Sequence, residues 1–256
     1  MRSYLQQTLR VLCCSALAGC AGTDAGRDAM PDAGLLLSHF EAVAFTDQYD
    51  PKRDVGRVRK WTGPIRIALH GAEAPRFGAV IRRYAVELAG LTQLSIDVLA
   101  APDARANFDI RFVAWDDMEK EAQAFAPRPD WLGIIVEGAA CLFIIRRNDR
   151  YEIVRALVLV STREADDDKA RCLLEEMTQA LGLPNDSDRL QPSIFNSFDR
   201  LSALTPADRI MIRILYDPRL VPGQRREEAI AHARKIIGEL LGSGRSSELR
   251  SGRGPN

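Results

Sequence analysis

The sequence predicts an α+β fold, and the order of its apolar patterns supports this prediction. Residues 65–69 alternate apolar and polar side chains, as a half-buried strand does. Between Phe77 and Leu91, apolar residues recur at spacings of three and four, which is typical of an amphipathic helix. Three or four strand-like runs, another helix and a mostly helical C-terminal part follow. This order indicates a mixed, twisted sheet with a helical C-terminal subdomain.

The strands and helices after residue 91 are placed by composition and by local signals. We expect strands at 95–99 and 108–115, a short polar helix from 116 to about 126, and apolar runs at 132–136, 141–145 and 151–160. The last two runs form a hairpin around a turn at 148–150. A helix is expected at 166–181, with Asp166, Asp167 and Asp168 at its positive end and Gly182 and Pro184 ending it. Helices are also expected after the cap Thr205-Pro206 and at 225–241.

Composition is consistent with one globular domain and gives no sign of a nucleic-acid partner. The chain has 256 residues, of which 46% are hydrophobic and 27% are charged, enough for one sizeable core. Its 35 basic and 35 acidic side chains cancel. Because no long run of like charge appears, we expect no nucleic-acid binding.

The N-terminus has the features of an export signal. Arg2 and Arg10 flank a short apolar run, 11–18, and small residues lead into Cys20. The run is too short for a membrane-spanning helix, which needs about 20 residues. The residues before Cys20 resemble a bacterial lipobox, so we expect residues 1–19 to be removed and Cys20 to carry a lipid. Ordinary secretion and an incidental apolar terminus are the alternatives.

This interpretation divides the chain and places it in the bacterial cell envelope. We expect a lipidated N-terminus and tether at 20–60 with a short helix at 36–45, a single domain at 61–241, and a disordered tail at 242–256. The protein would be anchored in a membrane by its lipid and would face the periplasm. An aspartate directly after the lipidated cysteine would resemble an inner-membrane retention signal. This position is Ala21 here, so the outer membrane is slightly preferred.

Two cysteines remain for the folded domain. Cys13 and Cys14 leave with the signal, and Cys20 carries the lipid. Cys141 and Cys172 are then an even pair in an oxidising compartment, and we expect them to form a disulfide. Two buried free thiols are the alternative.

The helix at 166–181 carries the chemistry on which a function can be based. Glu175 and Gln179 are four residues apart, so they lie on one face of a helix with Glu176 beside them, while Leu174, Met177 and Leu181 form the buried face. Zinc peptidases use this layout with histidines at the first and fifth positions and a glutamate, the general base, at the second. Here neither histidine is present.

The pattern beyond this helix resembles the metzincin metallopeptidases. Gly182 stands where the metzincin motif has its glycine, and Asn185 stands at the third histidine. The resemblance implies that Glu175, Gln179 and Asn185 occupy the ligand positions and that Glu176 matches the general base. Ser193-Ile194-Phe195 resembles a degenerate methionine turn, and residues 204–216 are similar to the closing helix of matrixin-type enzymes. A zincin-like fold with an active-site-type helix is therefore implied.

A closer resemblance is to a proteobacterial family of predicted lipoproteins, the domain of unknown function 2927. It is carried by residues 175–188, 192–196 and 215–220, and we extend it back to about Trp61. This family implies no established activity.

The ligand positions argue against zinc. One carboxylate and two amides would hold zinc weakly, so we expect neither a catalytic metal nor a cofactor. We expect His39, His70 and His232 to be surface or core residues. A harder cation bound by Glu175, Glu176, Asp186 and Asp188 remains an alternative, as do turn-forming roles for the two aspartates.

Two classes of function follow. The first is a non-catalytic envelope lipoprotein that binds a peptide, a protein or a cell-wall component in a cleft lined by Glu175, Glu176, Gln179 and Asn185, where the edge strand 141–145 could pair with an extended chain. The second is a metal-dependent peptidase or hydrolase with atypical ligands and Glu176 as general base. A structural module without a ligand, in which these residues are relics, is a third interpretation.

Overall fold

A mixed sheet is the centre of the computed structural model, which describes residues 31–45, 56–101, 105–127, 140–196 and 198–251, with side chains up to 242. The strands are β1 (Ile65–His70), β2 (Ile96–Val98), β3 (Phe108–Val113), β4 (Cys141–Arg147) and β5 (Ile153–Ser161). Their order is β2-β1-β3-β5-β4. All neighbours run parallel except β4, an edge strand that is antiparallel to β5. The predicted hairpin is confirmed, whereas the run at 132–136 lies outside the described residues.

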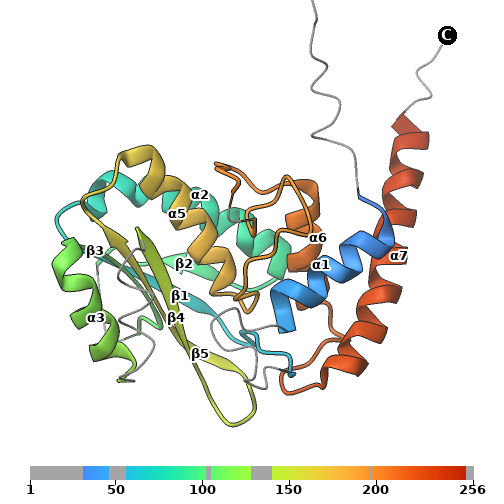
Figure 1. The fold of residues 1–256 in the computed structure, drawn as a ribbon, viewed down its shortest axis with the longest axis horizontal. Coiled ribbons are helices and arrows are strands. Elements are labelled where there is room, and N and C mark those ends of the chain that lie inside the picture. The colour runs from blue at the N-terminus through green and yellow to red at the C-terminus, as the bar shows by residue number, and fades with distance from the viewer. Residues whose placement is uncertain (1–30, 46–55, 102–104, 128–139, 197, 252–256) are drawn as a thin grey trace, which may run out of the picture.

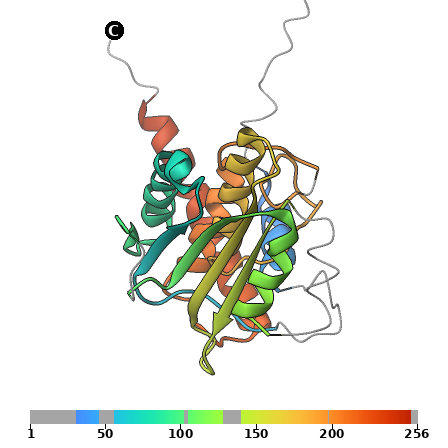
Figure 2. The ribbon, with the colours of Figure 1, turned by 90° about the vertical axis from the view of Figure 1, so that its left-hand side faces the viewer.

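Helices cover both faces of the sheet (Figures 1 and 2). They are α2 (Ala74–Thr92) and α5 (Asp166–Gln179) on one face, and α3 (Met118–Phe125), after the short 3-10 helix η2 (Trp115–Asp117), on the other. Ile110 and Val158 point into the main core with α2 and α5. Leu157 and Leu159 point the other way and pack with Met118 and Ala122 of α3. Burial on both faces explains why β5 has a continuous apolar run at 156–160.

Three more helices form the part of the molecule beside the sheet: α1 (Ala33–Phe45), α6 (Pro206–Tyr216) and α7 (Arg226–Ser251) (Figure 1). With six α-helices and five strands among the described residues, the predicted α+β class is confirmed. α7 continues to Ser251, past the boundary at 241 from which the sequence predicts a disordered tail. None of the helices that the model describes is both long and apolar enough to cross a membrane.

The packed body begins earlier than residue 61, where the sequence analysis placed its boundary. Leu36, Phe40 and Val43 of α1 are completely buried in the main core. Their spacing of four and three puts them on one helical face, which α6 and α7 cover. The segment 33–45 is therefore part of the folded body and not part of a tether.

Both ends of α6 are fixed by side chains. Thr205 accepts a hydrogen bond from the Asp208 N–H (3.1 Å), and the Asp208 carboxylate accepts one from the Thr205 N–H (2.8 Å), which makes the predicted cap a full capping box. At the other end, Lys60 Nζ donates to the carbonyl oxygen of Leu215 (3.0 Å). Burial lowers the pKa of Lys60 to about 8.

Candidate functional site

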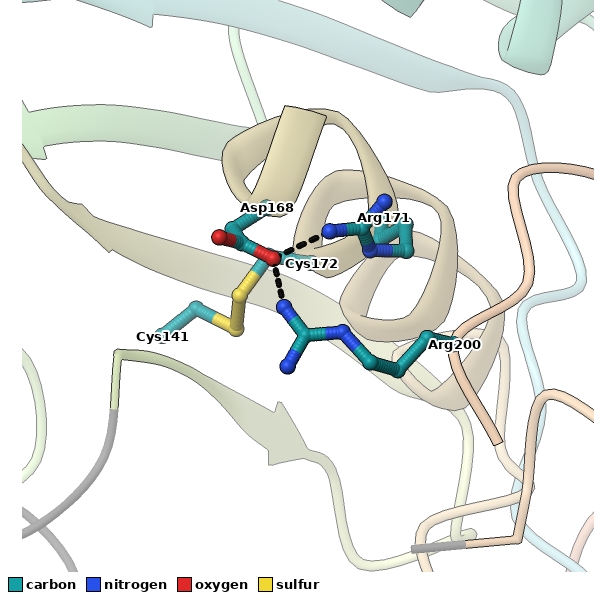
Figure 3. Close-up of a disulfide and its surroundings, with 5 residues drawn as sticks. All are labelled: Cys141, Asp168, Arg171, Cys172 and Arg200. Carbon is teal, nitrogen blue, oxygen red and sulfur yellow. Dashed lines mark hydrogen bonds and ion pairs between the residues drawn. A yellow bond between two sulfur atoms is a disulfide. The ribbon is translucent and has the colours of Figure 1, made fainter. Parts of the chain in front are cut away.

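Helix α5 is attached to the edge strand β4 at two points. The first is the disulfide between Cys141 and Cys172, with Cα atoms 6.1 Å apart, which confirms the predicted pair (Figure 3). The second is a hydrogen bond from the backbone N–H of Phe143 to the carboxyl group of Glu176. Two strand residues rise about 6.6 Å and four helical residues rise about 6 Å, so both attachments fit a helix that runs alongside the strand.

Charged side chains surround the outer part of this attachment. The Asp168 carboxylate on α5 accepts hydrogen bonds from Arg171, one turn further along, and from Arg200 (Figure 3). The bond from Arg171 and the charge of Arg200 hold the pKa of Asp168 below its usual range. The loop after α5 is therefore connected to the first turns of the helix, close to the disulfide.

The bond between Phe143 and Glu176 lies on the outer edge of the sheet. Ser161 N donates to the carbonyl of Ala140, which stands opposite it in the β4–β5 register. Because inward and outward backbone groups alternate along an antiparallel strand, those of Cys141, Phe143 and Ile145 point away from β5. Glu176 thus satisfies an N–H group that an edge strand would otherwise leave open.

Three carboxyl groups interact around this point. Glu176 is 6% exposed, and its pKa is raised well above the usual value by burial and by the charges of Glu175 and Asp186, against the lowering effect of the Phe143 N–H. Burial and Asp186 raise the pKa of the half-buried Glu175 to about 7. Groups coupled in this way favour states in which they hold a proton between them.

Gln179 belongs to the same group but is not on an open face. Its side chain is 4% exposed, and Nε2 donates to Asp186 Oδ1 over 2.6 Å. The sequence predicts that Gln179 lines an accessible cleft, but Asp186, in the loop after α5, covers it instead. The predicted buried face is confirmed, since Leu174, Met177 and Leu181 are each at most 1% exposed.

Asn185 is turned away from Glu175 and Gln179. Its side-chain Nδ2 and its backbone N–H both donate to the carbonyl oxygen of Val43 in α1, each over 3.2 Å. The next residue, Asp186, is the one that contacts Gln179 and acts on Glu175. The spacing of the motif predicts Asn185 as the residue near Glu175 and Gln179. The sequence feature that could have identified Asp186 instead is the pair of acids after Pro184, Asp186 and Asp188.

The turn at Gly182 determines the direction in which the chain leaves α5 towards Asn185. Gly182 has φ of 121°, and a Cβ atom there would lie 2.1 Å from the carbonyl oxygen of Arg59. Trp61 Nε1 donates to the carbonyl of Ala180 (3.0 Å), and Tyr216 Oη donates to that of Leu181 (2.9 Å). The end of α5 is therefore pressed against the segment before β1 and against α6.

The segment 193–195, which resembles a methionine turn, forms a buried polar centre. Ser193 Oγ donates to Asp208 Oδ1 (2.7 Å) and lies 3.3 Å from His39 Nε2. All three side chains are completely buried and connect α1, this segment and α6. Burial, and next the charge of Arg189, lower the pKa of His39 to about 4.

The three histidines have hydrogen-bond partners other than Glu175 and Glu176. His39 is a core residue, His70 Nε2 lies 2.8 Å from Asp109 Oδ1 across the sheet, and His232 Nδ1 lies 2.9 Å from the carbonyl oxygen of Arg219. Across the part of the chain that the structure describes, no group of three or more His, Cys, Asp or Glu residues is arranged to hold a metal ion. The charges of Glu175 and Asp186 thus raise the pKa of Glu176 although the three residues do not form such a group, and Asp188 is exposed.

A comparison with protein families identifies the kind of domain. The family described as a protein of unknown function (DUF2927) matches this chain over residues 35–235. The chain belongs to the DUF2927 family. This confirms the resemblance carried by residues 175–220, and the DUF2927 match starts within α1, in agreement with the place of that helix in the core. A comparison with curated proteins finds no match.

Proposed function

We propose that this DUF2927 protein is a non-catalytic lipoprotein of the bacterial cell envelope, with a metzincin-like fold, that binds a peptide, protein or cell-wall ligand at the carboxyl groups of α5. The observation that carries the proposal is the hydrogen bond from the Phe143 N–H to Glu176. The glutamate at the general-base position is engaged by the main chain of its own sheet.

A general base must be ionised and must reach the proton that it removes. Glu176 is 6% exposed, and burial raises its pKa well above the usual value, which disfavours the ionised form that a base needs. The amide at the third ligand position, Asn185, donates to Val43. These features support a scaffold in which the positions of a zinc site have acquired structural contacts.

The metzincin-like part of the proposal is supported by the order and contacts of the elements. A sheet with an antiparallel edge strand precedes a helix that lies along that strand, and a glycine turn and a helical part follow. The sequence blocks that resemble metzincins fall on this helix, on this turn, on the loop segment 193–195 and on α6.

The chemistry of the ligand follows from Glu175 and Asp186. Both are half-buried, and the charge of Asp186, after burial, raises the pKa of Glu175, so a cation placed between them would relieve their repulsion. An ammonium or guanidinium group on a peptide or on a cell-wall component fits this requirement. An extended ligand that paired with β4 would use the outward groups of Cys141 and Ile145 and would have to displace Glu176 from Phe143.

Elemental analysis and peptidase assays on the purified chain test the non-catalytic assignment. We expect no stoichiometric metal and equal background rates for the wild type and Glu176→Gln. One observation favours the alternative hydrolase, since the pKa of about 7 at Glu175 suits proton exchange at neutral pH. Stoichiometric zinc, together with proteolysis that is abolished by Glu176→Gln, would establish that alternative.

Calorimetry with lysine-containing cell-wall peptides and with their N-acetylated forms tests the ligand class. The free amines should bind and the acetylated forms should not, and the Glu175→Gln/Asp186→Asn pair should lose binding. Glu227→Gln/Glu228→Gln, two exposed acids on α7, is the matched control. Metabolic labelling with a fatty acid, lost in Cys20→Ala, tests the anchor, and membrane fractionation tests the preference for the outer membrane.

A further inference from the structure

The tip of the β4–β5 hairpin lies next to the start of α7 (Figure 1). Two arginine side chains lie close to Tyr151 at this tip. The guanidinium carbon of Arg147 lies 4.1 Å from the centre of the Tyr151 ring, and that of Arg57 lies 5.6 Å from it. Arg57 also pairs through its backbone with Arg225. Arg150 precedes Tyr151 in the turn, so the backbones of three separate segments bring four arginines near this tip.

Within the described parts of the chain, these cations form no ion pairs with acids. Among the residues that the structure describes, none of Arg57, Arg147, Arg150 and Arg225 forms an ion pair with a carboxylate. The acids in the same turn are Asp149, which is exposed, and Glu152, which accepts a hydrogen bond from Asn148 Nδ2 (2.6 Å). The positive charge of this surface is therefore available to a partner.

Tyr151 itself has an unfavourable backbone conformation. Its φ is 65°, in the left-handed region where a hairpin of this kind normally has glycine or asparagine. The turn is closed by hydrogen bonds from Tyr151 N to the Asn148 carbonyl and from Asn148 N to the Glu152 carbonyl, each over 3.0 Å. An aromatic residue at such a position indicates that its ring, which lies near two guanidinium groups, has a functional role.

Exposed apolar side chains flank the arginines. Val154, further along β5, is 43% exposed, and Val221, two residues before Gly223, is 52% exposed. Gly223 lies next to the Tyr151 ring, since a Cβ atom there would be 3.6 Å from Cδ2. Arginine, tyrosine and aliphatic side chains together match the interface of a bilayer, where phosphates meet the first methylene groups.

We propose that this arginine surface, formed by Arg57, Arg147, Arg150, Tyr151, Val221 and Arg225, docks on the phosphate headgroups of an anionic lipid membrane. This inference rests on the proposed function, because the lipid anchor is what would hold the protein close to a membrane. Glu41 of α1 pairs with Arg226, next to the surface, over 2.5 Å. The start of α1 is about 12 Å along the helix from Glu41, and the thirteen residue steps from Cys20 to Ala33 reach at most about 45 Å. The anchor can therefore bring the surface to the bilayer.

Co-sedimentation with vesicles tests the surface without the anchor. The full chain carrying Cys20→Ala is mixed with phosphatidylcholine vesicles that contain either no phosphatidylglycerol or ~30% of it. We expect binding to the anionic vesicles that weakens with salt, and a loss of about tenfold or more in Arg147→Glu/Arg150→Glu. The matched control is Arg82→Glu/Arg83→Glu, an exposed pair on α2 with the same change of net charge, which should bind as the parent does.

Tyr151→Asn separates binding from folding. Asparagine tolerates the left-handed conformation, so the melting temperature should stay close to that of the parent, while vesicle binding should fall. Equal loss in both double variants, no effect of lipid charge, or binding to soluble polyphosphate but not to vesicles would overturn the proposal. Because fatty-acid labelling tests the anchor separately, failure of the anchor and failure of the surface give different results.

Discussion

The backbone N–H of Phe143 donates a hydrogen bond to the carboxyl group of Glu176, so the edge strand of the sheet and the helix beneath it share a buried acid. In a hydrolase the same glutamate would have to face a substrate. Its position against β4 explains both its raised pKa and the coupling to Glu175 and Asp186, and it leads to the first prediction.

Glu176→Gln should stabilise the protein at alkaline pH. A carboxyl group whose pKa is raised by folding contributes stability at low pH, which is lost as the pH rises through its folded pKa. A glutamine still accepts the bond from Phe143 but has no charge to bury. We expect the free energy of unfolding of the variant to exceed that of the wild type at pH 8, and the difference to be smaller at pH 5. Urea titrations at both pH values measure this, and a gain that is larger at pH 5 would contradict it.

Acid should destabilise the protein through His39. Folding lowers the pKa of His39 from 6.5 to about 4. The neutral, buried histidine therefore contributes fully to the stability of the fold above pH 6.5, and this stability is lost as the pH falls towards 4. The full effect is about 3 kcal/mol. His39→Phe, which cannot be protonated, should therefore lose less stability than the wild type between pH 7 and about 4.5. Parallel urea titrations measure the two slopes, and equal slopes would show that His39 is not responsible.

Removal of the disulfide should cost much of the stability of the domain. Cys141 and Cys172 are 31 residues apart, and closing a loop of this length contributes about 3–4 kcal/mol on the chain-entropy model. We expect Cys141→Ser/Cys172→Ser to lose about this amount in guanidinium unfolding. The wild type in reductant serves as the comparison, since it should fall to the level of the variant, which itself should not respond to reductant.

Gly182→Ala should be among the most destabilising single changes in the chain. The new methyl group would lie 2.1 Å from the backbone oxygen of Arg59, at a φ of 121° that alanine rarely adopts. A loss of about 3 kcal/mol or more is expected. Gly90→Ala is the matched control, because that site in α2 is open and alanine favours a helix, so its stability should rise by up to about 1 kcal/mol. Thermal unfolding of both variants distinguishes a local clash from a general effect of glycine replacement.

The elements of the sheet and its helices could be predicted because their signals are local. Alternation in β1, the apolar stripe of α2 and the cap at Thr205 each act within a few residues, and all three elements are found close to their expected bounds. α5 ends at Gln179, two residues earlier than predicted, because the chain already turns towards Gly182. The place of α1 in the core was missed, although Leu36, Phe40 and Val43 carry the necessary spacing, because the surrounding composition resembled a tether.

The candidate site was predicted less well because its contacts span distant parts of the chain. Motif spacing identifies Glu175, Glu176 and Gln179 as neighbours on one helix but does not say which atoms cover them. The partner of Glu176 is on β4, and the partner of Asn185 is on α1, 142 residues away in sequence. Which partners Glu176 and Asn185 reach is determined by two long-range contacts. These are the packing of α5 against the edge strand β4 and the packing of the turn at Gly182 against Arg59.

The pair Cys141 and Cys172 also bears on how the protein matures. Beyond residue 20 the chain contains no other cysteine, so each of the two thiols in the folded part has a single possible partner there. If the protein is exported, loses residues 1–19 and carries a lipid on Cys20, as we propose, oxidation cannot scramble the pairing. Its maturation would then need a thiol oxidase but no isomerase to correct errors. A host strain that lacks the isomerase should therefore produce the protein as well as one that has it, whereas a strain without the oxidase should accumulate a form that proteases degrade.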